Sequence, residues 1–197
     1  MTFMRAHASD VKEISLHPIT LVAAAGAVAV SLLLAPGYDG LLGAGLAVVM
    51  VLIAAVDLAH YAIPDELTAA GFVLAFVYTA IHNGDAVVTA AGAAALRAAV
   101  LALLFWLLRV VYHWLRGRDG LGLGDVKLAA VAGAWLTWQA IPAAVDIAAF
   151  SALAVYGARQ YFLRRPLRPT AKLPFGAFFG PAIWLGWVFE TVILRKI

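Results

Sequence analysis

The sequence contains no cysteine, which excludes disulfide bonds, thiolate catalysis and zinc sites with cysteine ligands. Charge is also scarce, because only 13% of the 197 residues are Asp, Glu, Lys or Arg, whereas 64% are hydrophobic. A soluble globular domain has about 25% charged and about 45–50% apolar residues. The composition therefore excludes a soluble domain and predicts a protein whose main solvent is lipid.

The formal net charge is only +3, and the basic residues lie mainly between the apolar runs. In such a chain, basic loop residues set the membrane topology and contact lipid headgroups. We therefore expect membrane lipids, and no nucleic acid, among the partners of this chain.

Long apolar runs follow one another along the sequence, separated by Gly, Pro and charged residues. A membrane helix needs roughly 20 apolar residues to cross a hydrocarbon core about 30 Å thick, and the alternating pattern of an outer-membrane barrel is absent. We predict a single all-α domain, residues 1–197, forming a polytopic membrane bundle of about six or seven transmembrane helices. The apolar segments are Ile19–Ala35, Leu41–Val56, Leu67–Ile81, Ala86–Leu108, Val126–Trp138, Ala140–Ala158 and Phe175–Leu194.

The basic residues predict the orientation of the chain. No small-x-small cleavage site follows the first segment, so we interpret it as a retained span preceded by a cytoplasmic leader, residues 1–17. With the amino terminus inside, most basic residues also lie inside, as the positive-inside rule requires. Those predicted inside are Arg5, Lys12, Arg116, Arg118, Lys127, Arg159, Arg164, Arg165, Arg168 and Lys172, and those predicted outside are Arg195 and Lys196.

Arg97 lies near the middle of the fourth segment, where an unpaired charge is unfavourable. Asp146, an unexplained acid in the sixth segment, is its candidate partner. An alternative is a broken fourth segment, in which residues 86–96 form an interfacial or re-entrant stretch and the true span begins near Arg97. Neither version changes the orientation of the later segments.

Two aspartates lie where predicted spans end or begin. Asp57 follows the second segment at its cytoplasmic end, and Asp125 directly precedes the fifth. Two spans lie between them, one outward and one back, so both carboxylates are expected on the same side at similar depth. This parity makes a catalytic pair possible.

Two neighbouring carboxyl groups can hydrolyse a peptide bond without a metal or a covalent intermediate. One deprotonates water while the other protonates or hydrogen-bonds the carbonyl oxygen. Because two like charges in a low dielectric cannot both ionise easily, one proton is shared and the apparent pKa values separate. Gly120, Gly122 and Gly124 let the backbone bend sharply and let a substrate strand approach Asp125.

Further polar residues are expected at the helix ends beside these aspartates. Asp125 is predicted to be the N-cap of the fifth helix, where free N–H groups and the helix dipole favour an anion. Pro64 is predicted in a turn, with Asp65 capping the third helix; Asp65 as the true partner of Asp125 is an alternative. Lys127 either lowers the pKa of Asp125, binds the substrate backbone or only determines topology.

Other hydrolytic sites are excluded by their missing motifs. The chain contains neither the His-Glu-x-x-His of a zinc enzyme nor the Gly-x-Ser-x-Gly of a serine nucleophile. His60 is interpreted as an interfacial polar residue beside Asp57 and Asp65, because a lone His among carboxylates is a poor zinc site. We therefore expect no metal and no cofactor.

The flanking motifs make the two aspartates more specific. Asp57 stands eight residues before Asp65 in Pro64-Asp-Glu-Leu-Thr68, and Asp125 stands in Gly122-Leu-Gly124-Asp125-Val-Lys127. This arrangement resembles the two-motif signature of the type IV prepilin peptidases, with Asp57 and Asp125 as the catalytic pair and Pro64, Asp65, Gly122, Gly124 and Lys127 in support. A third motif, Lys172-Leu-Pro174-Phe175-Gly176-Ala-Phe-Phe-Gly180-Pro181, resembles the family's helix entry but departs from it at Ala177, where a Pro is usual. The resemblance covers about residues 40–190.

The resemblance implies a peptidase of the cytoplasmic membrane, active at the cytoplasmic face. It would cleave basic leaders from pilin-like precursors just before their hydrophobic helix. Bifunctional relatives carry an insert between their first spans and methylate the new amino terminus. Only residues 36–40 occupy that place here, so we predict no methyltransferase activity and a likeness to the short, peptidase-only forms that serve Flp/Tad-type pili or archaeal flagellin-like filaments.

Two other classes of function compete with a peptidase. The first is a small ion- or proton-coupled transporter or channel subunit that uses intramembrane carboxylates, including Asp146 and Glu190, as a relay. The second is a non-catalytic assembly scaffold. The sequence leaves the oligomeric state and the precursor undetermined.

Overall fold

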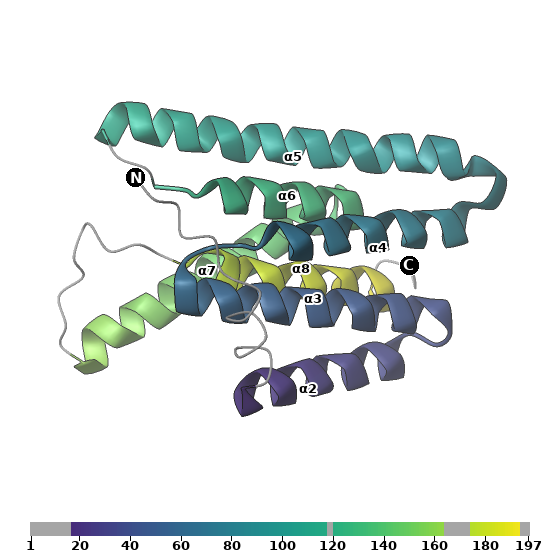
Figure 1. The fold of residues 1–197 in the computed structure, drawn as a ribbon, viewed down its shortest axis with the longest axis horizontal. Helices are drawn as coiled ribbons and strands as arrows, with labels where there is room; N and C mark the ends of the chain where they lie inside the picture. Colours follow the sequence, from purple (N-terminus) through teal and green to yellow (C-terminus); the bar gives the residue numbers. More distant parts are fainter. Residues whose placement is uncertain (1–16, 118–119, 164–173, 194–197) are drawn as a thin grey trace.

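The protein is all-α over the part that the structure, a computed structural model, describes, namely residues 17–117, 120–163 and 174–193. Every helix in these ranges corresponds to one of the predicted apolar segments, which confirms the fold class (Figure 1). The elements are α2 (Pro18–Leu34), α3 (Tyr38–His60), α4 (Asp65–Asn83), the 3-10 turn η1 (Gly84–Ala86), α5 (Val87–Arg116), α6 (Leu123–Trp135), α7 (Ala140–Leu163) and α8 (Gly176–Val192).

Three helical stretches are long and apolar enough to cross a membrane, namely Tyr38–His60, Asp65–Arg116 and Ala140–Phe162. The second contains α4, η1 and α5, which run antiparallel after the turn (Figure 1). The apolar helix α2 is shorter, with 17 residues. The chain is thus a helical membrane protein, and six or seven transmembrane helices stay a prediction.

Helix α8 lies inside the bundle, where it packs against α3, α7, α6 and α2, and α6 in turn packs against α5 and α4. Close approach of α8 to α3 depends on a small residue, because a Cβ on Gly180 would lie 2.9 Å from the carbonyl oxygen of Met50. Small residues bring membrane helices together because their backbones can then make contact directly. Large fully buried side chains from α3, α6 and α8 fill the space between them, among them Leu46, Met50 and Ile53, Leu128 and Val131, and Phe179, Ile183 and Trp187.

Helix α5 is continuous from Val87 to Arg116, so the alternative of a broken fourth segment is wrong. Its 30 residues correspond to a length of about 45 Å at 1.5 Å per residue. The helix is therefore longer than a hydrocarbon core and extends beyond the predicted end at Leu108.

Arg97 does not form the expected pair with Asp146. Its Nε donates a hydrogen bond to the carbonyl oxygen of Gly133 at 3.1 Å, and the carboxylate of Glu190 acts on it electrostatically. Asp146 is exposed on α7. The pair was predicted from charge and depth alone, whereas the packing of α5 on α6 directs Arg97 to a different neighbour.

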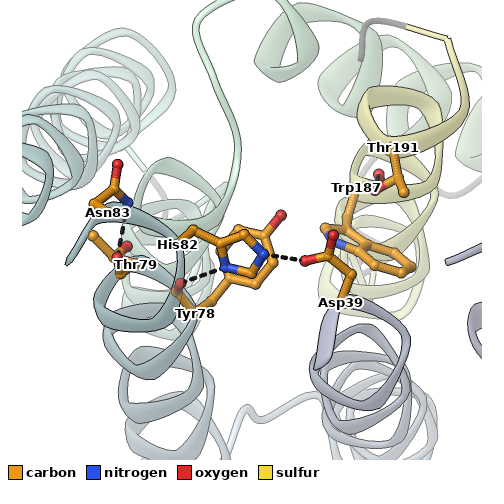
Figure 2. A network of polar contacts seen from close by, with 7 residues as sticks. All are labelled: Asp39, Tyr78, Thr79, His82, Asn83, Trp187 and Thr191. Atoms are coloured by element: carbon orange, nitrogen blue, oxygen red, sulfur yellow. Dashed lines mark hydrogen bonds and ion pairs between the residues drawn. The ribbon is translucent and has the colours of Figure 1, made fainter. Parts of the chain in front are cut away.

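Polar contacts connect the start of α3 with the end of α4 (Figure 2). His82 contacts the carboxylate of Asp39 through Nε2 and the carbonyl oxygen of Tyr78 through Nδ1, the latter at 2.8 Å. Asn83 donates to the carbonyl oxygen of Thr79 at 2.8 Å. The contact between His82 and Asp39 holds the start of α3 against the end of α4.

Several predicted features lie outside the described residues. They are residues 1–16 of the leader with Arg5 and Lys12, the loop residues Arg118, Arg164, Arg165, Arg168 and Lys172, and the carboxyl-terminal Leu194, Arg195 and Lys196.

Candidate active site

Asp57 and Asp125 lie at the same end of the bundle. Asp57 is in the last turn of α3, and Asp125 is in the first turn of α6. Figure 1 places these two helix ends on one side of the molecule, together with the first residues of α4 and α8. The charge of Asp57 acts on the carboxyl group of Asp125, so the structure brings together two acids that are far apart in the sequence.

Asp57 is buried, with 5% of its surface exposed. Its Oδ2 accepts a hydrogen bond from the backbone N–H of Ala177, at 2.9 Å. Ala177 belongs to the first turn of α8, where N–H groups have no partner within the helix and the helix dipole favours an anion. The start of α8 therefore offsets part of the unfavourable burial of a negative charge on Asp57.

Gly176 makes this contact between α8 and Asp57 possible. A Cβ at this position would lie 3.0 Å from Asp57 Oδ2 and 2.7 Å from Ile63 Cδ1. The backbone of α8 can approach the carboxylate only because the side chain is missing. Sequence reasoning noted Gly176 within the third motif but assigned it no role, and the glycine-rich motif was the one signal available.

Three phenylalanines support the start of α8. Phe105 of α5 stacks on Phe179 with ring centroids 5.5 Å apart, and Phe175 lies 5.2 Å from Phe179 and 6.2 Å from Phe105. Aromatic rings bury large apolar areas at preferred separations of this size. The cluster thus fixes the helix end whose N–H group holds Asp57, and no motif in the sequence pointed to it.

Asp125 was predicted to be the N-cap of its helix, and this prediction is wrong. The N-cap is Gly122, and Asp125 is the third helical residue, whose Oδ2 accepts a hydrogen bond from the Gly122 N–H at 2.9 Å. An acid at this position reaches back to the start of the helix, as in one half of a capping box. The helix therefore begins at Leu123, three residues before the predicted segment, and Asp125 faces the site from inside its first turn.

The pKa of Asp125 is raised to about 6. Burial of the carboxyl group is the largest cause, the hydrogen bond from Gly122 opposes it, and the charge of Asp57 adds to it. Asp125 lies outside the three stretches long enough to span a membrane. A carboxyl group that holds its proton up to about pH 6 can serve as an acid close to neutral pH.

Replacing Asp125 with Asn is expected to raise the midpoint of thermal unfolding, Tm, at pH 8 but not at pH 4. The folded pKa of about 6 lies above the ordinary value of 3.8, so the folded protein keeps a proton that the unfolded chain releases. Stability contributed by Asp125 therefore falls as pH rises from about 4 to about 6 and stays low above that. Asn carries no charge, and its Oδ1 still accepts from Gly122.

The measurement is Tm of both proteins in detergent at the two pH values. The gain at pH 8 should be a few degrees, because 1 kcal/mol corresponds to roughly 2–4 °C in a chain of this size. Equal differences at pH 4 and pH 8 would contradict the raised pKa.

Asp65, Pro64 and Lys127 form a second group beside the pair. Pro64 is the N-cap of α4, and Asp65 is the first helical residue, so Asp65 is not the predicted cap. Its Oδ1 instead accepts from Lys127 Nζ at 2.6 Å, with both side chains exposed. The bridge joins α4 to α6, and an exposed pair of this kind contributes only about 0–1 kcal/mol. Lys127 therefore contacts Asp65 and not Asp125.

Two of the three glycines before Asp125 pack against side chains. A Cβ on Gly120 would lie 2.4 Å from the Tyr112 ring, and one on Gly124 would lie 2.9 Å from Ile63 Cβ. Gly122 is exposed. The predicted approach of a substrate strand to these glycines stays a prediction.

Glu190 belongs to the opposite end of the bundle. It stands 14 residues after Gly176 on α8, a distance of about 21 Å along a helix. There it lines a cavity of about 570 Å³ with Arg97, Gln139 and Trp135. Glu190 therefore lies far from Asp57, and Asp146 on α7 is exposed.

His60 lies exposed at the end of α3. Across the described ranges, no group of three or more His, Asp or Glu side chains is arranged to hold a metal ion.

The chain is similar to known leader peptidases. The family model described as the type IV leader peptidase family matches residues 44–157, a range that contains both aspartates. The prepilin leader peptidase/N-methyltransferase of Aeromonas hydrophila is 30% identical over 181 residues, which cover 90% of this chain and 59% of that protein. The protein of the same name from Burkholderia pseudomallei (strain K96243) is 35% identical over 80% of this chain and 48% of its own length.

A shorter relative matches over more of its own length. Leader peptidase HopD of Escherichia coli is 32% identical over 134 residues, which cover 66% of this chain and 82% of that protein. By contrast, the chain spans between about half and three fifths of the two longer relatives. No solved structure matches.

Proposed function

The chain belongs to the type IV leader peptidase family, and on that premise we propose that it is an aspartic endopeptidase with Asp57 and Asp125 as its catalytic pair. One observation carries the proposal: the ends of α3 and α6 bring these carboxyl groups to one end of the bundle, where the charge of Asp57 acts on Asp125. Asp65, the alternative partner of Asp125, is exposed and bound to Lys127, which favours Asp57.

The chemistry follows from a pair that holds one proton. The ionised carboxylate takes a proton from water, whose oxygen attacks the carbonyl carbon of the scissile bond, while the protonated carboxyl group gives its proton to the carbonyl oxygen. Collapse of the resulting diol breaks the C–N bond. The leaving nitrogen takes the proton that came from water, and one diol hydroxyl returns its proton to the carboxylate that had protonated the carbonyl oxygen. The pair ends with one proton again, ready for another cycle. The two apparent pKa values belong to the pair and not to either residue. The raised pKa of Asp125 nevertheless makes Asp125 the first candidate for the acid.

The substrates we propose are type IV pilin-like precursors with a basic leader and a following apolar helix. A basic leader stays near anionic headgroups while the apolar helix enters the bilayer, so the junction reaches the depth of a site at the end of the bundle. The positive-inside rule places this end at the cytoplasmic face of the cytoplasmic membrane.

We further propose that no N-methylation follows cleavage. The longer relatives are named as both peptidases and N-methyltransferases, whereas HopD is named only as a leader peptidase. In this chain only three residues, Ala35 to Gly37, connect α2 with α3. That connection offers no room for an inserted domain between these helices.

The test is cleavage of a precursor by the purified chain in liposomes. The precursor carries a basic leader that ends in Gly, followed by an apolar helix. We expect release of the leader, and mass spectrometry of the product should show a free, unmethylated amino terminus. The control precursor has its leader lysines and arginines replaced with Gln and should be cleaved more slowly. Absence of cleavage of the basic precursor would contradict the proposed function.

A further inference from the structure

Ile63 lies between the starts of α6 and α8. A Cβ on Gly124 would lie 2.9 Å from Ile63 Cβ and 3.2 Å from its Cγ1, and a Cβ on Gly176 would lie 2.7 Å from its Cδ1. The Ile63 side chain therefore packs with Cβ and Cγ1 against the backbone of α6 and with Cδ1 against the backbone of α8. Alanine at either glycine would collide with it.

The backbone around Ile63 holds this side chain in place. Tyr61, the C-cap of α3, has φ 54 and ψ 38, a left-handed conformation that is unfavourable for a residue with a bulky side chain. Pro64 follows Ile63, and a proline restricts the residue before it to extended conformations. The β-branched Ile63 is also stiff at χ1. Pro64 and the β-branch thus limit the conformations that Ile63 can adopt beside the two glycines.

Each of the two glycines that Ile63 contacts lies next to one of the two acids, Gly124 in the sequence and Gly176 in space. Gly124 directly precedes Asp125. Gly176 directly precedes Ala177, whose N–H holds Asp57 Oδ2 at 2.9 Å, and a Cβ on Gly176 would lie 3.0 Å from the same oxygen. Ile63 thus separates the two pieces of backbone that carry or hold the acids.

We infer that Ile63 is a positioning residue, which acts as a spacer that fixes the distance between the carboxyl groups of Asp57 and Asp125. The inference rests on the proposed peptidase function, because only a reaction that needs both acids depends on their spacing. A shorter side chain at this position lets the start of α8 move toward α6. The acids then approach each other, and their mutual repulsion increases.

The test compares Ile63→Val with the wild-type protein in the precursor cleavage assay. Valine keeps the Cβ and loses Cδ1, the atom that touches Gly176. We expect kcat to fall by roughly tenfold, since a misplacement of 1 Å at a reacting centre costs up to about 10²-fold, while KM changes little. The alkaline limb of the pH profile should move to higher pH, because stronger repulsion holds the shared proton longer. The matched control is Ile81→Val, the same change at an exposed position on α4.

A double variant gives a second, independent readout. Alanine at Gly176 collides with Cδ1 of Ile63, so Ile63→Val should restore part of the kcat that Gly176→Ala loses, whereas two unrelated defects would multiply. The recovery of kcat should be incomplete, because the methyl group added at position 176 still lies close to Asp57 Oδ2.

The outcomes separate this inference from the proposed function. Absence of cleavage by the wild-type chain contradicts the function. The spacing can then still be judged without substrate, because Ile63→Val should shift the pH range over which Tm falls. Unchanged kcat and pH profile, multiplicative losses in the double variant or, without cleavage, an unchanged pH dependence of Tm would overturn the role of Ile63.

Discussion

Asp57→Asn and Asp125→Asn are each expected to lower precursor cleavage by at least about 10³-fold, because either change removes the acid–base exchange on which hydrolysis depends. Asparagine has nearly the same size as aspartate, and its Oδ1 can accept the hydrogen bond from Ala177 at position 57 or from Gly122 at position 125. The helix ends should therefore keep their positions. The measurement is kcat/KM for leader release in liposomes, together with Tm as a check of folding.

The matched control is Asp146→Asn, the same chemical change at an exposed position on α7. We expect it to leave cleavage within about twofold of the wild type, as surface substitutions change stability by only about 0.5 kcal/mol. Cleavage that survives in Asp57→Asn or Asp125→Asn would reject the pair. Loss of function in Asp146→Asn with only an altered function in Asp57→Asn would favour the ion- or proton-coupled transporter. Tolerance of all three changes would favour the assembly scaffold.

Gly176→Ala is expected to lower kcat by roughly 10²-fold while the protein still folds, since displacement of a reacting group by about 1 Å has an effect of this size. The added methyl group would lie 3.0 Å from Asp57 Oδ2 and 2.7 Å from Ile63 Cδ1. Either the carboxylate or the start of α8 has to shift, and the hydrogen bond from Ala177 lengthens. Alanine is otherwise a better helix residue than glycine, so the loss reports on the site.

The control for this change is Gly92→Ala on α5, where an added Cβ meets nothing within 4 Å. It should keep cleavage and either keep or raise Tm. Equal kcat for Gly176→Ala and the wild type would show that the contact between α8 and Asp57 is dispensable. A parallel fall of kcat and Tm would instead indicate a folding defect.

The fold class and the location of the two acids were accessible from sequence because both depend on local properties. Apolar runs near the thickness of a bilayer can satisfy their backbone only as helices, and the seven predicted segments correspond to α2 through α8. Counting the segments then placed Asp57 and Asp125 on one side. The third motif also pointed to the start of α8, although without a role.

Helix boundaries were less accessible, since they depend on single residues at the ends. The fifth segment was predicted to begin at Val126, but α6 begins at Leu123, because Gly122 starts the helix and Asp125 reaches back to it. The second segment was predicted to end at Val56, whereas α3 continues to His60 and carries Asp57 within its last turn.

The contacts that define the site were decided by tertiary structure alone. The N–H of Ala177 reaches Asp57 across 120 residues of sequence, Lys127 reaches Asp65 across 62, and Arg97 turns to Gly133 instead of Asp146. No periodicity encodes such pairs, because they follow from which helices pack together and how deeply. The sequence by itself determined that this protein is a helical membrane bundle with two acids at one end. Only packing decided that α8 holds one of them and that Ile63 lies between their supports, since these contacts join segments that meet only when the bundle closes.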